Sequence, residues 1–399
     1  MLSDSSRVRL RMDETTPVSA PVARLVARWG WMAPPLAIAI SVRVAIFLAV
    51  DFAAQLIAKT GLRSSFAIWH RFDVGFYVII ARDGYGSAQP VDKLANFFPL
   101  YPMAMSVAGH IVALFYHYDP YNVGGMIVSW LSFFAACVVL YRLVLDRFEQ
   151  GVAYGAVLLF ATFPFSFYYG ISYTESLYML VTFIAFLGIE RRNWAMASIG
   201  AMLASAARPP GLIVGACVVV AYGLEWWRLR HGWRWDVLWL ALTPAGALLY
   251  MLYCWIALGN PLAYKVASQV GWHGATLTGN NIVLAWHLFF GFNGPADFNT
   301  RIYRLYFALA ALFLLSMVLV WRWLGPVYVL YSVPSILAPI LTYPYPTSLG
   351  RYVSVIFPTF IVAALLVRKY PSMRTAIALF CAFFLALFAL LFTMGYAVY

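Results

Sequence analysis

Carboxylates are scarce in this sequence, so the residues that could act as acids or bases can be named individually. Only 15 of the 399 residues are Asp or Glu. Those on one predicted side of the apolar runs are mainly Asp73, Asp83, Asp92, Glu175 and Asp297. A carboxylate held in place is a suitable general base for an attacking hydroxyl group. This short set therefore contains the candidates for acid–base catalysis.

Asp73 begins a stretch with helical periodicity. The residues that would share one stripe of such a helix are Asp73, Phe76, Tyr77, Ile80 and Ala81. Gly84 followed by Tyr85 is a helix stop signal. We expect an amphipathic helix lying on the membrane, with a carboxylate at its N-terminal end. The competing interpretation is that Asp73 merely caps this helix.

Glu175 lies where an apolar segment begins, directly after Tyr173 and Thr174. Ionisable groups at such a depth in a membrane protein are costly and are commonly functional. The competing interpretation is that Glu175 only favours the start of a helix through the helix dipole.

Two arginines interrupt other apolar stretches. Arg208 precedes Pro209, Pro210 and Gly211, and Arg351 follows the proline-punctuated residues 343–346. A simple turn would explain the first arginine, and anchoring to lipid headgroups would explain the second. Together with Asp73 and Glu175, they form a set of two carboxylates and two cations on one predicted face.

Such a set suits group transfer from a lipid phosphate. A sugar-phosphate donor releases an anionic phosphate, so its leaving group needs cations and hydrogen bonds more than a general acid. The acceptor hydroxyl needs a positioned carboxylate base. An isoprenoid tail needs an apolar groove between helices, which this composition supplies.

The composition requires that these residues be positioned by membrane helices. Hydrophobic residues make up 63% of the sequence and charged residues 11%, whereas soluble domains carry about 25% charged residues. We therefore predict an all-α, polytopic membrane protein. The net charge of +12 is typical of positively charged cytoplasmic loops and does not indicate nucleic-acid binding, because no stretch is both soluble and basic.

Standard signatures of soluble enzymes are absent from the sequence. It contains no phosphate-binding P-loop, no zinc-protease motif and no paired-cysteine motif. The four cysteines fall within apolar runs, which argues against disulfides and metal ligation; they are Cys137, Cys217, Cys254 and Cys381. The sequence establishes no cofactor. No cluster of ligands indicates a divalent metal, but a site for a lipid phosphate could recruit one.

The apolar runs define the predicted topology. They lie near 34–57, 97–117, 122–142, 152–170, 176–190, 194–207, 211–225, 237–258, 303–321, 326–342, 352–367 and 375–396. Arginine-bearing loops should be cytoplasmic, and their alternation with external loops allows about eleven true spans. Run 97–117 is then re-entrant or interfacial, because it carries Pro99 and Pro102. We expect a cytoplasmic tail over 1–33, one integral domain over 34–399, and long external loops near 58–96 and 259–302.

Six motifs occur in the order found in a known family. They are Arg71-Phe72-Asp73 with Tyr77, Ile80-Ala81 and Gly84-Tyr85; Phe97-Phe98-Pro99-Leu100-Tyr101-Pro102; Phe163-Pro164 through Tyr173-Thr174-Glu175-Ser176; Arg208-Pro209-Pro210-Gly211; Asn260-Pro261-Leu262-Ala263-Tyr264 with Gln269 and Trp272; and Ser348 to Tyr352 with Phe357-Pro358. This series resembles the PIG-V family of mannosyltransferases, which make the second mannose transfer of GPI-anchor synthesis, and their bacterial relatives. The resemblance covers residues 69 to 358.

The resemblance implies a GT-C type glycosyltransferase that takes a sugar, typically mannose, from a polyprenyl-phosphate donor on the non-cytoplasmic face. It implies inverting transfer with Asp73 as the catalytic base. We infer that Glu175 orients the acceptor or the base, and that Arg208 and Arg351 hold the donor phosphate. The other substrate-binding residues that it indicates are Arg71, Phe72, Tyr77, Tyr173, Gln269, Trp272 and Tyr352.

Three positions depart from the family pattern. Phe72 replaces the usual Trp and loses an indole donor, Pro210 stands where eukaryotic members have Asn, and Asn260 replaces Asp. Length and arginine content suggest a bacterial member in the inner (plasma) membrane, with a cytoplasmic N-terminus. The acceptor stays open between a glycolipid, a polysaccharide and a protein, and the sequence does not indicate an oligomeric state.

Two other functions compete with the enzyme. A transporter or flippase of lipid-linked sugars would show repeat symmetry and polar groups near the membrane midplane, whereas the polar set here gathers at one interface. We expect Arg43, in the first span, to extend its side chain to the interface. The third alternative is a non-catalytic membrane scaffold.

Overall fold

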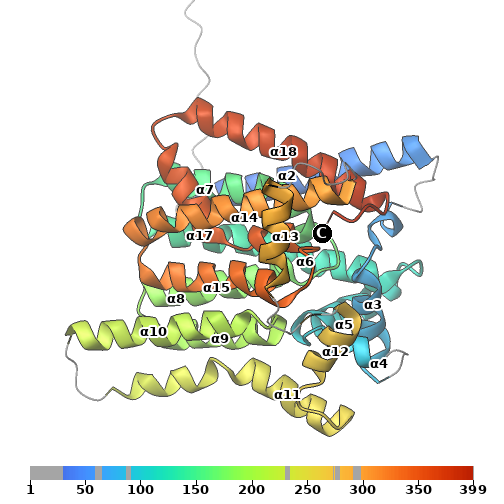
Figure 1. Ribbon diagram of the computed structural model, residues 1–399, viewed down its shortest axis with the longest axis horizontal. Coiled ribbons are helices and arrows are strands. Elements are labelled where there is room, and N and C mark those ends of the chain that lie inside the picture. The colour runs from blue at the N-terminus through green and yellow to red at the C-terminus, as the bar shows by residue number, and fades with distance from the viewer. Residues whose placement is uncertain are drawn as a thin grey trace, which may run out of the picture.

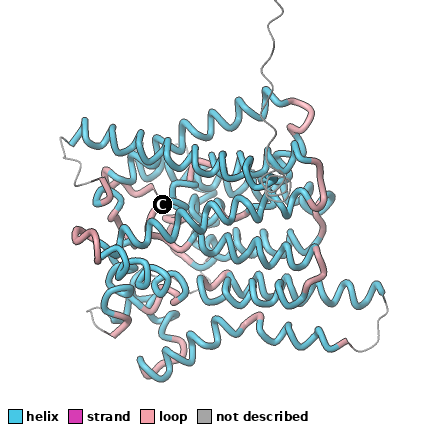
Figure 2. The backbone as a smooth tube through the Cα atoms, turned by 180° about the vertical axis from the view of Figure 1, so that it is seen from behind, coloured by secondary structure: helices cyan, strands magenta, loops and turns pink. Residues whose placement is uncertain are grey.

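The protein is built entirely from helices in the part of the chain that the structure describes. The computed structural model describes residues 30–58, 65–86, 91–229, 234–272, 274, 279–290 and 298–398. Within these ranges no strand occurs (Figure 2), which confirms the all-α prediction. Asp297, the side chain of Asp92 and most of the expected cytoplasmic tail lie outside the described residues.

Several helices are long and apolar enough to cross a membrane. They are α2 (Ala33–Ala58, preceded by η1, Gly30–Met32), α6 (Pro120–Leu145), α10 (Gly211–Leu229), α14 (Phe298–Trp323) and α18 (Pro371–Thr393). A sixth span results if η5 (Trp235–Leu242) and α11 (Ala245–Leu258), bent by 43°, are taken together. The protein is therefore an integral, multi-pass membrane protein.

Shorter helices fill the remaining bundle. They are α5 (Leu100–Ala113), α7 (Gln150–Thr162), α8 (Glu175–Glu190), α9 (Trp194–Ala207), α15 (Pro326–Thr342) and α17 (Phe357–Leu366). The expectation of eleven spans is not confirmed by these lengths. A helix of 14 residues, such as α5, rises about 21 Å, less than the ~30 Å of a hydrocarbon core. A hydropathy window does not separate a buried core helix from a span.

Two of the predicted runs are broken by local sequence. Run 152–170 divides into α7 and the 3-10 helix η4 (Ser166–Gly170), and run 352–367 divides into α16 (Leu349–Ser354) and α17. A proline lies near each break: Pro164 follows α7, and Pro358 occupies the first turn of α17. Proline fits a first helical turn and disrupts a helix interior. These breaks matter because the polar residues lie beside them.

Short helices gather at one end of the helix bundle. The longer helices lie roughly side by side, and the short helices α3 (Val74–Asp83), α4 (Val91–Leu94), α5 and α12 (Ala263–Trp272) gather at one end, on the right in Figure 1. Helix α13 (Asn280–Phe290) packs against α14 and α15. The predicted external loops 58–96 and 259–302 therefore contain helices of their own.

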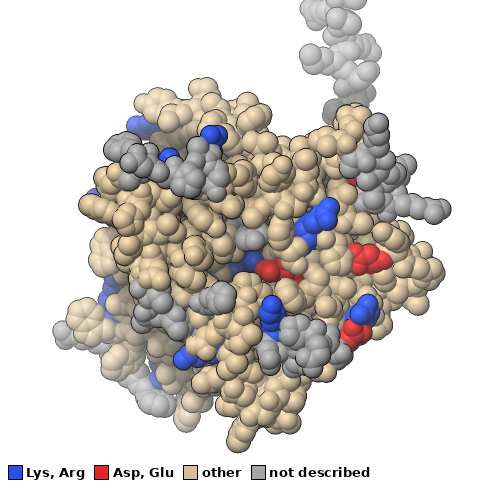
Figure 3. All heavy atoms as spheres, turned by 45° about the vertical axis from the view of Figure 1, so that its right-hand side comes forward, with Lys and Arg blue, Asp and Glu red and all other residues tan. Residues whose placement is uncertain are grey.

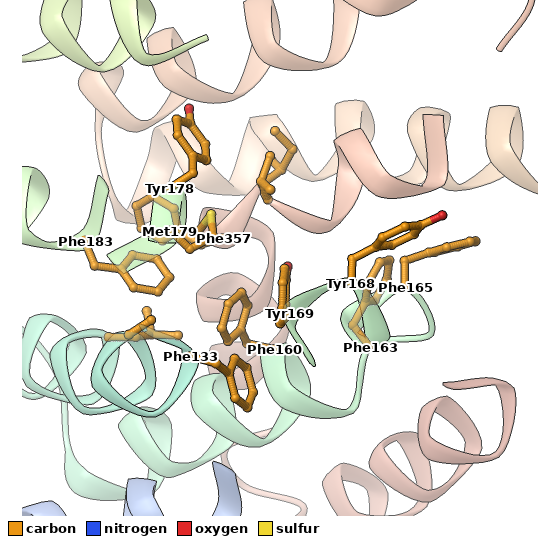
Figure 4. Close-up of a cluster of buried hydrophobic side chains, with 14 of the residues drawn as sticks. Phe133, Phe160, Phe163, Phe165, Tyr168, Tyr169, Tyr178, Met179, Phe183 and Phe357 are labelled. Atoms are coloured by element: carbon orange, nitrogen blue, oxygen red, sulfur yellow. The ribbon is translucent and has the colours of Figure 1, made fainter. Parts of the chain in front are cut away.

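Aromatic side chains fill the core between α6, α7, α8 and α17. Phe160 packs against Phe133 at 6.0 Å, Tyr169 at 4.8 Å and Phe183 at 5.6 Å between ring centroids. Phe183 continues the contact to Phe357 at 5.0 Å (Figure 4). Such stacked and edge-on ring pairs stabilise a core beyond the area that they bury. They hold the end of α7 against the middle of α8.

Helices α8 and α9 approach closely because small residues face each other. A Cβ atom on Gly188 would lie 2.5 Å from the backbone nitrogen of Ala197, and one on Gly200 would lie 2.7 Å from that of Ala185. The side chain of Asn193 caps α9 by accepting from the Met196 N–H at 3.0 Å. This close contact fixes the position of Glu175 at the start of α8 relative to Arg208 at the end of α9.

The buried arginine of the first helix does not behave as expected. Arg43 is 2% exposed, donates from Nη2 to the Ser166 carbonyl at 3.0 Å and lies 4.5 Å over the Phe133 ring. Its guanidinium also occupies the space that a side chain at Gly170 would need. The prediction that Arg43 extends to the interface is therefore wrong, because the carbonyl of η4 holds it inside the protein.

Candidate active site

Asp73 directly precedes α3, which ends at Gly84 with a φ of +80°. The side chain of Asp73 makes no capping hydrogen bond. Its Oδ2 instead accepts from Nη1 of Arg351 at 2.9 Å. The sequence therefore places the helix and its stop correctly, and capping does not account for the carboxylate.

The backbone before Asp73 is strained. Phe72 has a φ of +51°, a conformation that is rare for a bulky residue and that persists only where its surroundings hold it. The backbone N–H of Asp73 donates to the Tyr173 hydroxyl at 3.2 Å. This turn directs Asp73 towards the bundle and away from the helix that it begins.

Glu175 is the first residue of α8 and is 0% exposed. Its Oε1 accepts from Nη1 of Arg208 at 2.7 Å and from Nε of Arg351. The positive end of the helix dipole favours a carboxylate in this position. Glu175 thus begins a helix and also forms two buried ion pairs, one with each arginine.

The two arginines come from separate breaks in the bundle. Arg208 directly follows α9 and Arg351 lies within α16, and both side chains are 8% exposed. Arg351 lies 4.6 Å over the ring of Tyr173, and Arg208 lies 5.5 Å over that of Tyr352. Aromatic faces attract buried guanidinium groups. Anchoring to lipid headgroups is therefore not the role of Arg351.

Burial changes the acidity of Asp73. Desolvation raises the pKa of the Asp73 carboxyl above its ordinary value, although the nearby Arg351 acts in the opposite direction. A base with a raised pKa takes up a proton more readily near neutral pH. The cluster as a whole pairs two carboxylates with two guanidinium groups, so its formal charges cancel.

Two cavities meet at Asp73. The first, of about 230 Å³, contains Asp73, Tyr77, Arg208, Arg351 and Tyr352 in its wall, and we call it the arginine cavity. The second, of about 400 Å³, we call the aromatic cavity. Its lining residues are Phe72, Asp73, Phe76, Tyr173, Trp272, Tyr343, Pro344, Tyr345, Thr347 and Ser348. Asp73 and Trp272 belong to both cavities.

The surface at this end of the molecule carries few charges. Figure 3 views it from the side of the short helices and shows red and blue residues next to each other near the middle of a mainly uncharged face. Within the described residues, no group of three His, Cys, Asp or Glu side chains could hold a metal ion. The polar side chains that line the site include a carboxylate, guanidinium groups and hydroxyls.

Most of the residues singled out from the sequence come together here. The structure brings into one cluster Phe72, Asp73, Tyr77, Tyr173, Glu175, Arg208, Trp272, Arg351 and Tyr352. Trp272 ends α12 and makes edge contacts with Phe76 at 5.8 Å and Phe97 at 5.6 Å.

Two of the predicted substrate-binding residues line neither cavity. Arg71 is exposed, and its Nε donates to the Thr393 carbonyl at the end of α18 at 3.0 Å. Gln269 is exposed on α12 one turn before Trp272. The bend at Phe72 separates Arg71 from Asp73, and a turn of helix displaces Gln269 by about 5 Å. Asp83 pairs with the exposed Arg82.

Several lining residues were not predicted from the sequence. Tyr343, Tyr345 and Thr347 contribute to both cavities. They belong to the stretch where prolines alternate with tyrosines, between α15 and α16. Proline interruption leaves a chain unable to form a helix and thus able to line a cavity. That alternation was the available signal.

Comparisons with known proteins add a distant structural likeness. No known protein-family model matches the sequence, and no curated protein is similar to it. The structure is similar to the oligosaccharyltransferase of Archaeoglobus fulgidus in its apo form, with a TM-score of 0.46 and 14% identity, over 90% of this chain and 54% of that chain. Against the same enzyme tethered to an acceptor peptide, the TM-score is 0.45 with 14% identity, over 90% and 55%.

A third similar structure is AglB, the oligosaccharyltransferase of the same archaeon, in complex with an inhibitory peptide and a dolichol-phosphate. Its TM-score is 0.44 with 12% identity, over 90% of this chain and 56% of that chain. This protein thus spans little more than half the length of that enzyme. A likeness this distant leaves the function to be argued from the site.

Proposed function

We propose that this protein is a membrane-embedded glycosyltransferase of the GT-C type that moves a hexose from a polyprenyl-phosphate donor to a hydroxyl group. We propose mannose as the hexose, from the resemblance to the PIG-V family. The observation that carries the proposal is the position of Asp73. Its carboxylate borders the arginine cavity and the aromatic cavity at once and is paired with Arg351.

The arginine cavity fits the donor phosphate. A guanidinium group carries five N–H donors. The hydrogen bonds described above use Nε and Nη1 of Arg351 and Nη1 of Arg208, which leaves donors on both side chains for phosphate oxygens. Arginine binds phosphate well because its donors form a rigid fork. Apolar residues of α15 in the same wall, such as Ala338 and Ile340, would contact the isoprenoid chain.

The aromatic cavity fits the acceptor. Among the described residues, Asp73 is the only Asp, Glu, Lys or Arg in its wall, which also contains aromatic rings and the hydroxyl groups of Thr347 and Ser348. Aromatic surfaces with a few polar groups are typical of sites that bind and orient small ligands. We assign this cavity to an uncharged part of the acceptor that carries the attacking hydroxyl.

The reaction follows from this division. The acceptor oxygen attacks the anomeric carbon of the hexose from the side opposite the phosphate and forms the new glycosidic bond. The bond from the anomeric carbon to the phosphate oxygen breaks, and polyprenyl phosphate leaves towards Arg208 and Arg351. The hydroxyl proton passes to Asp73 and then to water. Attack from the opposite side inverts the configuration.

Glu175 has a different role in this proposal from Asp73. It is fully buried and lines neither cavity. We therefore place it as a positioning residue that holds Arg208 and Arg351, without contact to substrate. This refines the expectation that Glu175 orients the acceptor or the base.

The proposal includes a location. Positively charged loops at the other end of the bundle, such as Arg191 and Arg192, favour a cytoplasmic position for that end. The site would then face the external side of a bacterial plasma membrane, where a polyprenyl-phosphate sugar is accessible. The N-terminus would be cytoplasmic.

The test is transfer of labelled mannose from polyprenyl-phosphate-mannose in membranes that contain the protein. We expect a labelled product that depends on the protein and on the lipid donor. Transfer from a glucose or galactose donor, and not from the mannose donor, would show that the transferred sugar is not mannose. The proposed transfer reaction itself would still stand. Movement of the intact donor lipid across vesicles, with no product, would contradict the enzyme and support a flippase.

A further inference from the structure

The segment that carries Asp73 is held by contacts from several separate elements. The Phe66 carbonyl accepts from Nδ2 of Asn122 in α6 at 3.1 Å. Arg71 donates to the Thr393 carbonyl of α18 at 3.0 Å, and the Asp73 N–H donates to Tyr173 at 3.2 Å. We call residues 66–73 the base segment. Its contacts leave little freedom for the residue that the proposed mechanism uses as base.

The base segment also makes a side-chain contact that the proposed mechanism does not use. Nδ1 of His70 lies 2.7 Å from Oδ2 of Asp119, and the side chains are 33% and 19% exposed. A carboxylate only accepts, so the Nδ1–H of His70 must donate. This nitrogen can carry its hydrogen in neutral and in protonated histidine.

Asp119 is itself held in an unusual conformation. It precedes α6 with a φ of +52° and makes no capping hydrogen bond with its side chain. A capping bond is the usual role of aspartate at this position. Instead the carboxylate is directed to His70. Phe72, two residues after His70, has a φ of +51°. The contact thus joins two segments that each contain a residue with a positive φ, and the bulky Phe72 is the strained one.

We propose that His70 and Asp119 form a positioning pair for the catalytic base. The pair holds the base segment in its left-handed turn at Phe72, so that the Asp73 carboxylate borders both cavities. Strained conformations persist where the surroundings fix them, and they are found at functional sites. This inference rests on the proposed function for its kinetic consequence, but its structural consequence is independent.

The central variants are Asp119→Gly and Asp119→Asn. Glycine accepts a positive φ without strain and removes the carboxylate. Asparagine tolerates the left-handed region and keeps an oxygen that can accept from His70. We expect Asp119→Gly to lower kcat about 10-fold or more with KM changed less than about threefold, because small displacements of a reacting group are costly. Asp119→Asn should restore kcat to within about threefold of the wild type.

Asp83→Asn is the matched control. It removes an exposed ion pair with Arg82 at the other end of α3 and does not touch the base segment. We expect it to leave kcat and KM unchanged. If Asp119→Gly only made the protein less stable, Asp119→Asn would not restore kcat. The loss would also not be confined to kcat with KM nearly constant.

A second measurement does not depend on activity. Hydrogen exchange of the peptide over residues 66–77, in detergent or nanodiscs, should be faster in Asp119→Gly than in the wild type and unchanged in Asp83→Asn. If Asp119→Gly does not fold, His70→Ala and His70→Gln take its place, since glutamine can still donate. Unchanged exchange and unchanged kcat in folded variants would overturn the pair. Absence of transfer by the wild type would overturn the proposed function. The hydrogen-exchange data would still show whether His70 and Asp119 hold the base segment in place.

Discussion

The two ends of helix α8 each carry a glutamate bound to arginine, and they differ in almost every other respect. Glu175 begins the helix, is 0% exposed and pairs with Arg208 and Arg351. Glu190 ends it, is 20% exposed, and accepts from Arg147 at 2.9 Å and from the Tyr328 hydroxyl at 2.7 Å. The helix dipole favours the first carboxylate and disfavours the second.

The partners of the two glutamates also differ. Arg147 donates as well to the carbonyls of Trp323 and Leu324 at the end of α14, and this satisfies carbonyls that a helix end leaves without partners. None of the cavities described above is lined by Glu190 or Arg147. At the Glu175 end, both arginines border a cavity. A buried charge cluster next to a cavity indicates a functional site. A charge cluster that pairs with the free carbonyls of helix ends indicates a structural role.

Replacement of Glu175 should have the largest effect on stability. Glu175→Gln leaves two buried guanidinium groups without their shared carboxylate. Breaking a buried ion pair by removing one partner costs about 3–5 kcal/mol. We expect a large loss of folded protein, measured by thermal unfolding in detergent. A change of less than about 1 kcal/mol would contradict the account of this end as a buried cluster.

Arg351→Lys should have the largest effect on activity at unchanged formal charge. Arg351 reaches Asp73 through Nη1 and Glu175 through Nε, and a single ammonium group does not reproduce that fork. We expect kcat/KM to fall about 100-fold, by analogy with the loss of one preorganised donor. Arg147→Lys, at the other end, is the matched control and should keep transfer. Equal losses in both variants would remove the distinction between the ends.

The pH dependence should show the raised pKa of Asp73. The base acts when deprotonated, so transfer should fall as the pH decreases through a value above the ordinary range of aspartate, with up to about a 10-fold loss per pH unit. Stability has the opposite sign. Because the pKa is raised in the folded state, this group stabilises the fold at low pH, and that contribution is lost as the pH rises through the folded pKa. A kinetic limb at the ordinary pKa of aspartate would contradict the burial described here.

Glu190→Gln should have the smallest effect. The carboxylate is partly exposed, and pairs of this kind contribute up to about 1 kcal/mol. We expect transfer within about twofold of the wild type and a small decrease in the unfolding temperature. A large loss of transfer with intact folding would show that the two ends are coupled through α8.

Much of the helix content of this fold can be predicted from the sequence, but the number of helices that cross the membrane cannot. The ends of α8 and α9 and the start of α10 agree with the apolar runs to within one residue, because Asn193 and the stretch Pro209-Pro210-Gly211 stand between these helices. The number of spans does not follow, since short helices such as α5 and α7 are as apolar as spans. Hydropathy measures composition and does not report whether lipid or protein surrounds a residue.

The site was predictable where charge interrupts apolar sequence. Asp73, Glu175, Arg208 and Arg351 are conspicuous for that reason, and the structure joins them. The aromatic cavity was predictable only in part. Phe72, Tyr173 and Trp272 were singled out from the sequence, whereas Tyr343 and Tyr345 were not, although prolines alternate with them. Nor was the contact between His70 and Asp119, which are 49 residues apart in the sequence.

The most direct test of the account is transfer by Asp73→Asn. The variant keeps size and hydrogen bonding but removes the base, and it should remain folded because Arg351 keeps Glu175 as its partner. We predict that transfer of labelled mannose falls about 100-fold or more, while the unfolding temperature stays close to that of the wild type. Equal transfer by wild type and variant, in equal amounts of folded protein, would contradict the assignment of Asp73 as the base.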